Sequence, residues 1–438
     1  MSFPLMLFLV VAAGMLISLP RHRAALPLLL GAIYIGTAQQ VEIGPLHFSA
    51  MRVLVVFGFI RLMVKGERIS GRFNALDWAM VLWAMAALTS SIFHSDGALV
   101  FRLGLVFDTL GIYILFRVFV SELNDIVNIF KMVCILIVPV AAAMLYEKLT
   151  GNNHFDVLGG GSGDAEYRNG HFRARGPFTH AILAGTIGAG CLPLALYFWQ
   201  QNRKLALAGL AAAGGIIFAS GSSGPIMSAM TVLGAMLLWK VQRHVRLIRW
   251  LVVMLLVVLN FIMNDPVYFL VARIDITGGS TGYYRAQLIK STIEHFNEWW
   301  FAGTDYTRHW MPTGIPANPN HTDITNHYIA MGVMGGLPLM LLFMWILFVA
   351  FAGIGKLLKS YENAPVEQRF LIWTLGATLF GHATTFFSIS YFDQANVFLY
   401  LLLANIGTLL AVQPSLAPVT SSEKVPDSPE DLKGTVVI

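Results

Sequence analysis

The chain has 438 residues, of which 56% are hydrophobic and only 12% are charged. Soluble domains carry roughly 25% charged residues, and the apolar residues here form long continuous runs, so the composition excludes a soluble globular protein. It predicts an all-α polytopic membrane protein. The net charge of +5 is spread over short loops, so it does not indicate a nucleic-acid partner.

Thirteen apolar runs follow one another along the chain and predict a membrane helical bundle of about 12–13 transmembrane helices. The runs cover residues 3–19, 25–38, 46–64, 76–93, 99–119, 126–147, 177–199, 203–219, 223–239, 246–263, 326–353, 369–388 and 394–412. The second run is short, so it is either a span or a re-entrant segment. The first run has no basic segment before it, so we interpret it as a span rather than a signal peptide. Residues 1–412 form the predicted membrane domain.

Lysine and arginine occupy every second loop between these runs, whereas the short alternate loops have none. The positive-inside rule therefore places the basic loops in the cytoplasm. Two long polar segments, residues 148–176 and 264–327, then form extracytoplasmic loops on the side of the N-terminus. Residues 413–438 are rich in Pro, Ser and mixed charge, and we expect a disordered cytoplasmic tail.

Several ionisable residues fall within the runs and should face the bundle interior, because a charge that faces lipid is costly. They are Arg52, Arg102, Asp108, Lys131, Glu147, His382 and Asp393. Arg102 and Asp108 are six residues apart and do not share a helix face, so we expect no pair between them. Cys134 and Cys191 also fall within runs and are expected to be buried.

The first polar loop ends in two arginines, Arg173 and Arg175, directly before a run. They lie on the side where the positive-inside preference disfavours them. They therefore either anchor to lipid headgroups or bind an anion. Pro177 is expected in the first turn of the following helix.

In the second loop, Ser280 or Thr281 can cap a helix that runs from Gly282 to about Trp299. Arg285 then lies in the first turn, where free N–H groups and the helix dipole favour an anion. Its guanidinium adds bidentate donors that suit phosphate. The alternative is that Arg285 reaches lipid headgroups.

The end of the second loop carries two histidines, His321 and His327, near the predicted membrane boundary. Thr325 or Asn326 can cap the next helix, and Asp323 is close enough to fix an imidazole tautomer. A neutral imidazole can take a proton from a hydroxyl. A zinc site is the rival interpretation, although no HExxH or paired-cysteine pattern supports it; it would use His309, His321, Asp323 and His327.

Aromatic residues are frequent in the same loop. They are Trp299, Trp300, Phe301, Tyr306, Trp310 and Tyr328. They form either an interfacial aromatic belt or a surface that stacks against sugar rings.

Four short motifs occur in a fixed order along the chain. They are Arg-Ala-Arg-Gly-Pro-Phe-Thr-His-Ala-Ile-Leu-Ala-Gly at 173–185, the turn Ser222-Ser223-Gly224, a Ser/Thr-rich lead into Tyr284-Arg285 followed by Trp-Trp-Phe-Ala-Gly at 299–303, and His321 followed eleven positions later by Gly332 and then Gly335. In these motifs, and in helix count and loop placement over about residues 40–412, the chain resembles the O-antigen ligase and polymerase superfamily of bacterial inner membranes.

This resemblance implies a metal-independent, inverting glycosyltransferase without a cofactor, in a multi-pass inner-membrane protein whose active site faces the periplasm. The donor would be a glycan on undecaprenyl diphosphate, and the acceptor a hydroxyl of lipid A core for a ligase or of another repeat unit for a polymerase. A membrane transporter is the second alternative.

The resemblance also implies residue roles. Arg285, with Arg175 and Arg173, would hold the diphosphate. The spacing of the motif favours His321 as the base that activates the acceptor. His327 is the alternative base, because it follows directly after Asn326. Asp323 and Asn326 would support the site.

Overall fold

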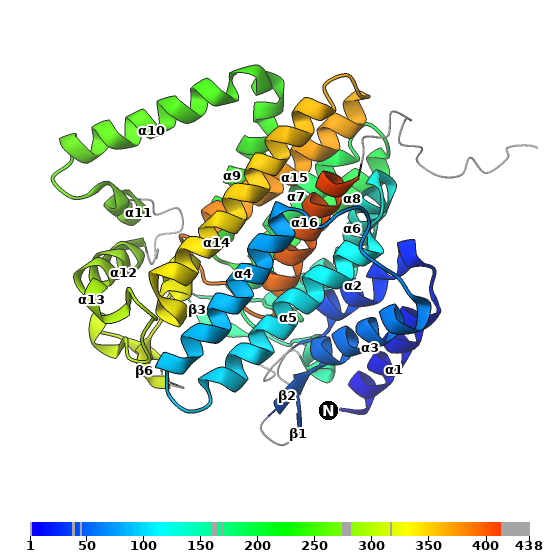
Figure 1. The fold of residues 1–438 in the computed structure, drawn as a ribbon, viewed down its shortest axis with the longest axis horizontal. Helices are drawn as coiled ribbons and strands as arrows, with labels where there is room; N and C mark the ends of the chain where they lie inside the picture. Colours follow the sequence, from blue (N-terminus) through cyan, green and yellow to red (C-terminus); the bar gives the residue numbers. More distant parts are fainter. Residues whose placement is uncertain are drawn as a thin grey trace, which may run out of the picture.

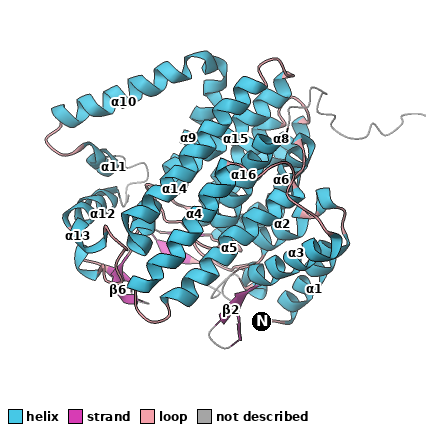
Figure 2. Cartoon of the chain, in the orientation of Figure 1, coloured by secondary structure: helices cyan, strands magenta, loops and turns pink. Residues whose placement is uncertain are grey.

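The computed structural model describes residues 2–36, 40–43, 46–159, 165–168, 170–273, 282–315 and 318–412. Each of the thirteen apolar runs contains a helix, and the described chain is overwhelmingly helical (Figure 2). These helices are α1 (Phe3–Ser18), α2 (Ala25–Tyr34), α3 (Ala50–Lys65), α4 (Ala75–Ser90), α5 (Ala98–Phe119), α6 (Leu123–Thr150), α7 (Ala181–Tyr197), α8 (Arg203–Ser220), α9 (Ser223–Leu237), α10 (Val245–Ile262), α14 (His327–Ser360), α15 (Val366–Thr385) and α16 (Gln394–Ala411).

By length and composition, seven helical segments in the described part of the chain could cross a membrane, and two shorter helices are similarly apolar. The all-α polytopic bundle is therefore confirmed. The predicted disordered tail, residues 413–438, lies outside the described residues.

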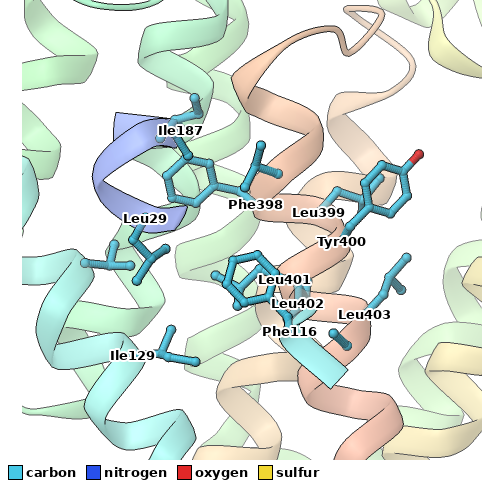
Figure 3. Close-up of a cluster of buried hydrophobic side chains, with 14 of the residues drawn as sticks. Leu29, Phe116, Ile129, Ile187, Phe398, Leu399, Tyr400, Leu401, Leu402 and Leu403 are labelled. Atoms are coloured by element: carbon cyan, nitrogen blue, oxygen red, sulfur yellow. The ribbon is translucent and has the colours of Figure 1, made fainter. Parts of the chain in front are cut away.

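Helix α16 occupies the middle of the bundle and is apolar on every side, as expected of a helix without a solvent face. Of its 18 residues, 83% are buried. Figure 3 shows its residues Leu399–Leu403 among side chains from α2, α5, α6 and α7, which include Leu29, Phe116, Ile129 and Ile187. The core is thus assembled around the last helix of the chain.

Helix α10 stands apart from the bundle (Figure 1). It is linked to α9 by the 3₁₀ segment η4 (Leu238–His244), and none of its residues is buried. It leads at its other end into η5 (Val267–Phe269) and α11 (Leu270–Arg273). An apolar helix that is exposed on all sides is stable only in an apolar solvent, which agrees with a membrane location.

Helix α14 is interrupted at Gly335 and Gly336, two glycines near the end of the fourth motif. Gly336 has a φ of +74°, and a Cβ there would lie 2.5 Å from the carbonyl oxygen of Phe301. The interruption frees backbone groups, and the N–H of Leu337 donates to the carbonyl of Trp300 at 2.7 Å. The glycines therefore allow the backbone of residues 299–303 to pack directly against the backbone of α14 and to accept a hydrogen bond from it.

Arg102 and Asp108, two of the charged residues within the apolar runs, are paired with polar groups. Arg102 is only 3% exposed and donates to Ser90 Oγ at 2.7 Å and to the freed carbonyl of Met334. Asp108 pairs with Arg52 at 2.8 Å rather than with Arg102. The interrupted α14 thus gains a buried cationic partner for its backbone.

Two expectations about buried charges are wrong. Lys131 is exposed on α6, a helix of 28 residues and therefore about 42 Å long, so its amine can reach past the hydrocarbon layer. Asp393 is exposed because it lies in the turn before α16 rather than within a helix. His382, Cys134 and Cys191 are buried, as predicted.

The loops contain short antiparallel hairpins that the all-helical prediction did not include. They pair β1 (Gln40–Ile43) with β2 (Leu46–Ser49), β3 (Glu166–Arg168) with β4 (His171–Arg173), and β5 (Gly314–Ile315) with β6 (Asn318–Thr322). In the second pair, Glu166 lies opposite Arg173. Each hairpin is too short to show a period-two pattern in the sequence.

The second polar loop also contains α12 (Gly282–Glu294), α13 (Phe296–Trp299) and η6 (Arg308–Trp310). The predicted helix from Gly282 to Trp299 therefore exists but is divided at His295. Its predicted cap, Ser280 or Thr281, lies outside the described residues.

Candidate active site

The turn between α15 and α16, residues 386–393, contacts both polar loops. From the second loop, Arg285 Nε donates to the carbonyl of Ser388 at 3.0 Å. From the first loop, Thr179 Oγ1 donates to Asp393 Oδ2 at 2.6 Å. This turn therefore joins two segments that are about a hundred residues apart in the sequence.

Asp393, at the end of this turn, is the one non-glycine residue with a positive φ, +50°, in the described part of the chain. Next to it, Gln394 Nε2 donates to the carbonyls of Pro177 and Ile35, each at 2.8 Å. Backbone in this region is strained and persists only where its surroundings hold it in place. This turn was not recognisable as part of the site from the sequence, where its only distinguishing feature is the lack of lysine and arginine.

Arg285 lies in the first turn of α12, as predicted, and is only 8% exposed. Burial lowers its pKa, and the nearby negative charge of Asp323 partly offsets that effect. An arginine remains protonated at neutral pH even so. Apart from Nε, no nitrogen of this guanidinium has a hydrogen-bond partner among the described residues.

Asp323 interacts electrostatically with Arg285 of α12 and with His180, which precedes α7. Burial raises its pKa, and the charges of His180 and Arg285 oppose the rise. On the α12 side, the hydroxyl of Tyr284 donates to the backbone carbonyl of Asp323 at 2.9 Å. A carboxyl group therefore stands within electrostatic range of both loops.

His180 links the first loop to this group and was not recognised as a site residue from the sequence. Its Nδ1 accepts a hydrogen bond from the Ile182 N–H at 3.2 Å, so His180 caps α7. Desolvation lowers its pKa, Arg173 and Arg175 lower it further, and Asp323 opposes them. Histidine is an unusual N-cap residue, so this role could not be predicted from the sequence.

The expected position of Pro177 in the first turn of α7 is wrong, because α7 begins four residues later, at Ala181. Gly176 has a φ of +58°, which turns the chain before the helix starts. The carbonyl of Pro177 is held by Gln394 instead.

The two arginines of the first loop have different surroundings. Arg173 is 6% exposed and is held by Glu166 at 2.8 Å and by Ser222 Oγ at 2.6 Å, so it ties the β3–β4 hairpin to the α8–α9 turn. Arg175 is half-buried, and its backbone N–H donates to the carboxylate of Glu147 at 3.1 Å. The side-chain contacts of Arg173 therefore indicate that it stabilises the fold of the first loop.

The two predicted histidines also differ. His321 is half-buried on β6, with Nδ1 3.4 Å from Thr307 Oγ1, and burial lowers its pKa. His327 is 3% exposed, and its Nδ1 accepts the N–H of Tyr391 at 3.1 Å. Its ring packs 4.9 Å from Phe386, so of the two, His321 is the more accessible.

Asn326 caps α14, since its Oδ1 accepts the N–H of Ile329 at 3.1 Å. This confirms one of the two predicted caps. The cap fixes the point at which the loop enters the bundle.

An open apolar groove of about 500 Å³ borders α12, α14 and α15. Its walls include Ile289, Met340, Met344, Phe351 and Phe387. Phe387 directly precedes Ser388, whose carbonyl holds Arg285. The groove is therefore close to the cationic group.

The loop aromatics fall into two sets. Trp299 and Trp310 are each 4% exposed and form a small core with Leu288. Trp300, Phe301 and Tyr306 are exposed. Neither an interfacial belt nor sugar stacking describes the buried pair, whose role is to hold the loop together.

The zinc set predicted as a rival does not come together. In the part of the chain that the structure describes, one group has ligand atoms close enough for a metal, and it consists of His295, Glu298 and His309. His321, His327 and Asp323 are not members of it. Of the four residues in the predicted zinc set, only His309 belongs to this group.

A family profile described as O-antigen ligase matches residues 207–344. The matched segment runs from α8 into α14, and it includes α12 with Arg285 and β6 with His321. The match confirms the resemblance to the O-antigen ligase and polymerase superfamily. A search of curated proteins gives no match.

Proposed function

We propose that this chain, a member of the O-antigen ligase and polymerase superfamily, transfers a glycan from undecaprenyl diphosphate to an acceptor hydroxyl. The family supports an O-antigen ligase or polymerase type of activity in a multi-pass membrane protein, with a lipid-linked glycan donor and a glycan acceptor. Within that class we propose a ligase of the bacterial inner membrane that uses lipid A core at the periplasmic face. A repeat-unit polymerase is the alternative.

One observation carries this proposal: a buried guanidinium is bound to the carbonyl of Ser388, the residue next to one wall of an apolar groove. A lipid diphosphate needs cationic donors for its headgroup and an apolar surface for its chain. Arg285 provides the first, and the groove between α12, α14 and α15 provides the second. Phe387 lines the groove, and the carbonyl of the next residue, Ser388, accepts the hydrogen bond from Arg285.

In the proposed mechanism, the Arg285 guanidinium, with its Nη groups, binds the diphosphate and stabilises the charge that develops on it as the glycan leaves. Arg175 contributes from the first loop, within electrostatic range of His180, and Arg173 supports it. Preorganised donors in a partly dry site stabilise such a charge strongly. This chemistry requires neither a metal nor a cofactor.

His321 is the proposed base, because it is neutral at neutral pH and accessible. It takes the proton of the acceptor hydroxyl as that oxygen attacks the anomeric carbon from the face opposite the diphosphate, which inverts the configuration. His327 is buried and accepts a backbone N–H, which supports a packing role instead. Asp323 and Asn326 would support the site by their charge and by the α14 cap.

The test uses full-length protein in detergent with lipid-linked glycan and either lipid A core or a second lipid-linked repeat. Product on lipid A core supports the ligase, and product on the repeat supports the polymerase. Arg285→Ala and His321→Ala should each lower the transfer rate by about 100-fold or more, whereas Arg273→Ala, which alters an exposed arginine of the same loop, should not. Transfer by both site variants at the wild-type rate would defeat the proposal.

A further inference from the structure

A cluster of side chains at the far end of α12 is not used by the proposed mechanism. His295 follows α12, Glu298 lies in α13, and His309 lies in η6. One ligand atom from each lies within 4.8 Å of the others. We propose that these three residues bind a single divalent transition-metal ion, with Zn²⁺ as the best-suited ion.

The separations are close to those that a metal requires. With bonds of about 2.1 Å to nitrogen and oxygen, tetrahedral ligands lie about 3.4 Å apart. His309 Nε2 lies 2.9 Å from Glu298 Oε2, so small side-chain rotations admit an ion. Two imidazoles and a carboxylate are a ligand set that suits zinc and leaves a fourth position for water.

The surrounding contacts orient the ligands. His295 Nδ1 lies 2.8 Å from the carbonyl of Ser291, and a donor there leaves the lone pair on Nε2. The indole N–H of Trp310 donates to Glu298 Oε2 at 3.0 Å. His295 stacks on Trp310 with ring centres 5.7 Å apart. Metal-binding histidines and carboxylates are commonly fixed by such second hydrogen bonds.

The ion would have a structural role rather than a catalytic one. His295 lies ten residues beyond Arg285, which corresponds to about 15 Å along a helix. The site joins η6 to the α12–α13 junction. Thr307, next to η6, has its Oγ1 3.4 Å from His321 Nδ1, and its backbone N–H donates to the carbonyl of Asn320 at 3.0 Å. A bound ion would therefore hold β6, with His321, against α12.

The experiment uses tag-free, full-length protein in detergent, treated with EDTA and then titrated with Co²⁺, whose visible absorption reports coordination by protein ligands. We expect one Co²⁺ per chain, displaced by Zn²⁺, and a Zn²⁺-dependent rise in the melting temperature. His309→Gln and Glu298→Gln should weaken Co²⁺ binding roughly tenfold or more. Glu298→Gln keeps an acceptor for Trp310, so it should remain folded if His309→Gln does not.

The control is His154→Gln, which alters an exposed histidine of the first loop. It should bind Co²⁺ as the wild type does. Two results would overturn the proposal: wild-type protein without a stoichiometric Co²⁺ spectrum, or a spectrum that survives unchanged in both site variants. Neither result depends on glycan transfer, so the proposed function stands or falls separately.

Discussion

At the scale of the residue, the site combines groups whose ordinary chemistry is altered by burial. Arg285 has a lowered pKa and Asp323 a raised one, and burial is the largest cause of both shifts. A desolvated guanidinium interacts strongly with an anion, because little water screens it. Its geometry also matters, since a guanidinium can bind two phosphate oxygens at once.

We therefore expect Arg285→Ala to lower the rate of glycan transfer by about 100-fold or more, the range seen when a single preorganised donor is removed. Arg285→Lys keeps the charge but loses the bidentate geometry, so it should restore only part of the rate. The measurement is kcat and KM for the lipid-linked donor. An Arg285→Ala enzyme with the wild-type kcat/KM would contradict the assignment.

The pH dependence follows from His321. Burial lowers its pKa below the usual 6.5, so the imidazole is neutral at pH 7 and gains a proton only as the pH falls through that lowered value. A base must be neutral to act, so the transfer rate should be maintained near pH 7 and decline on the acid side. The profile of kcat/KM against pH should lose this acid limb, along with most of its rate, in His321→Gln. An unchanged profile in that variant would exclude His321 as the base.

At the scale of the element, the interrupted helix α14 fixes the second loop. The interruption at Gly335 and Gly336 could be suspected only as a glycine pair in a run, because its partners, Arg102 and the 299–303 turn, come from other parts of the chain. The cap at Asn326 was predictable, because capping depends on residues three positions apart.

Gly336→Ala should destabilise the protein by about 1–3 kcal/mol, because alanine rarely adopts a φ of +74° and its Cβ would meet the carbonyl of Phe301. Thermal unfolding in detergent provides the measurement. Gly355→Ala, in the same helix, is the matched control, since a Cβ there would meet nothing within 4 Å. Equal melting temperatures for the two variants would show that the interruption is not required.

Asn326→Ala should cost about 1 kcal/mol through loss of the cap, while Asn326→Asp should keep most of it. Loss of the cap should reduce the fraction of molecules in which the N-terminus of α14 is correctly folded. The transfer rate should fall with this fraction, so kcat should change more than KM. If Asn326→Ala lowers activity at unchanged stability, the residue contacts substrate and its role is not that of a cap.

At the scale of the whole molecule, the thirteen apolar helices were predictable, because run length and hydrophobicity are local properties. The assembly of the site was not. Arg285 reaches Ser388 across 103 residues, and Thr179 reaches Asp393 across 214. Contacts between residues so far apart in the sequence leave no periodic pattern. The part that the α15–α16 turn and His180 play in the site is therefore visible only in the folded chain.

The apolar groove gives a prediction at this scale. Met344→Trp adds a large side chain to a wall of the groove and should raise KM for a donor with a long isoprenoid chain, but less so for a short-chain analogue. Leu341→Trp, an exposed residue of α14 outside the groove lining, is the control. Equal KM values for the wild type, Met344→Trp and Leu341→Trp would show that the groove does not bind the isoprenoid chain.

If both polar loops hold one diphosphate, arginines from each loop must contribute to its binding. This is measured as the affinity of the protein in detergent for undecaprenyl diphosphate. We expect Arg175→Ala and Arg285→Ala each to weaken binding by about tenfold or more, as loss of a charge-assisted hydrogen bond would, and Arg273→Ala to bind like the wild type. If Arg175→Ala binds as tightly as the wild type while Arg285→Ala does not, the two loops do not share a diphosphate site.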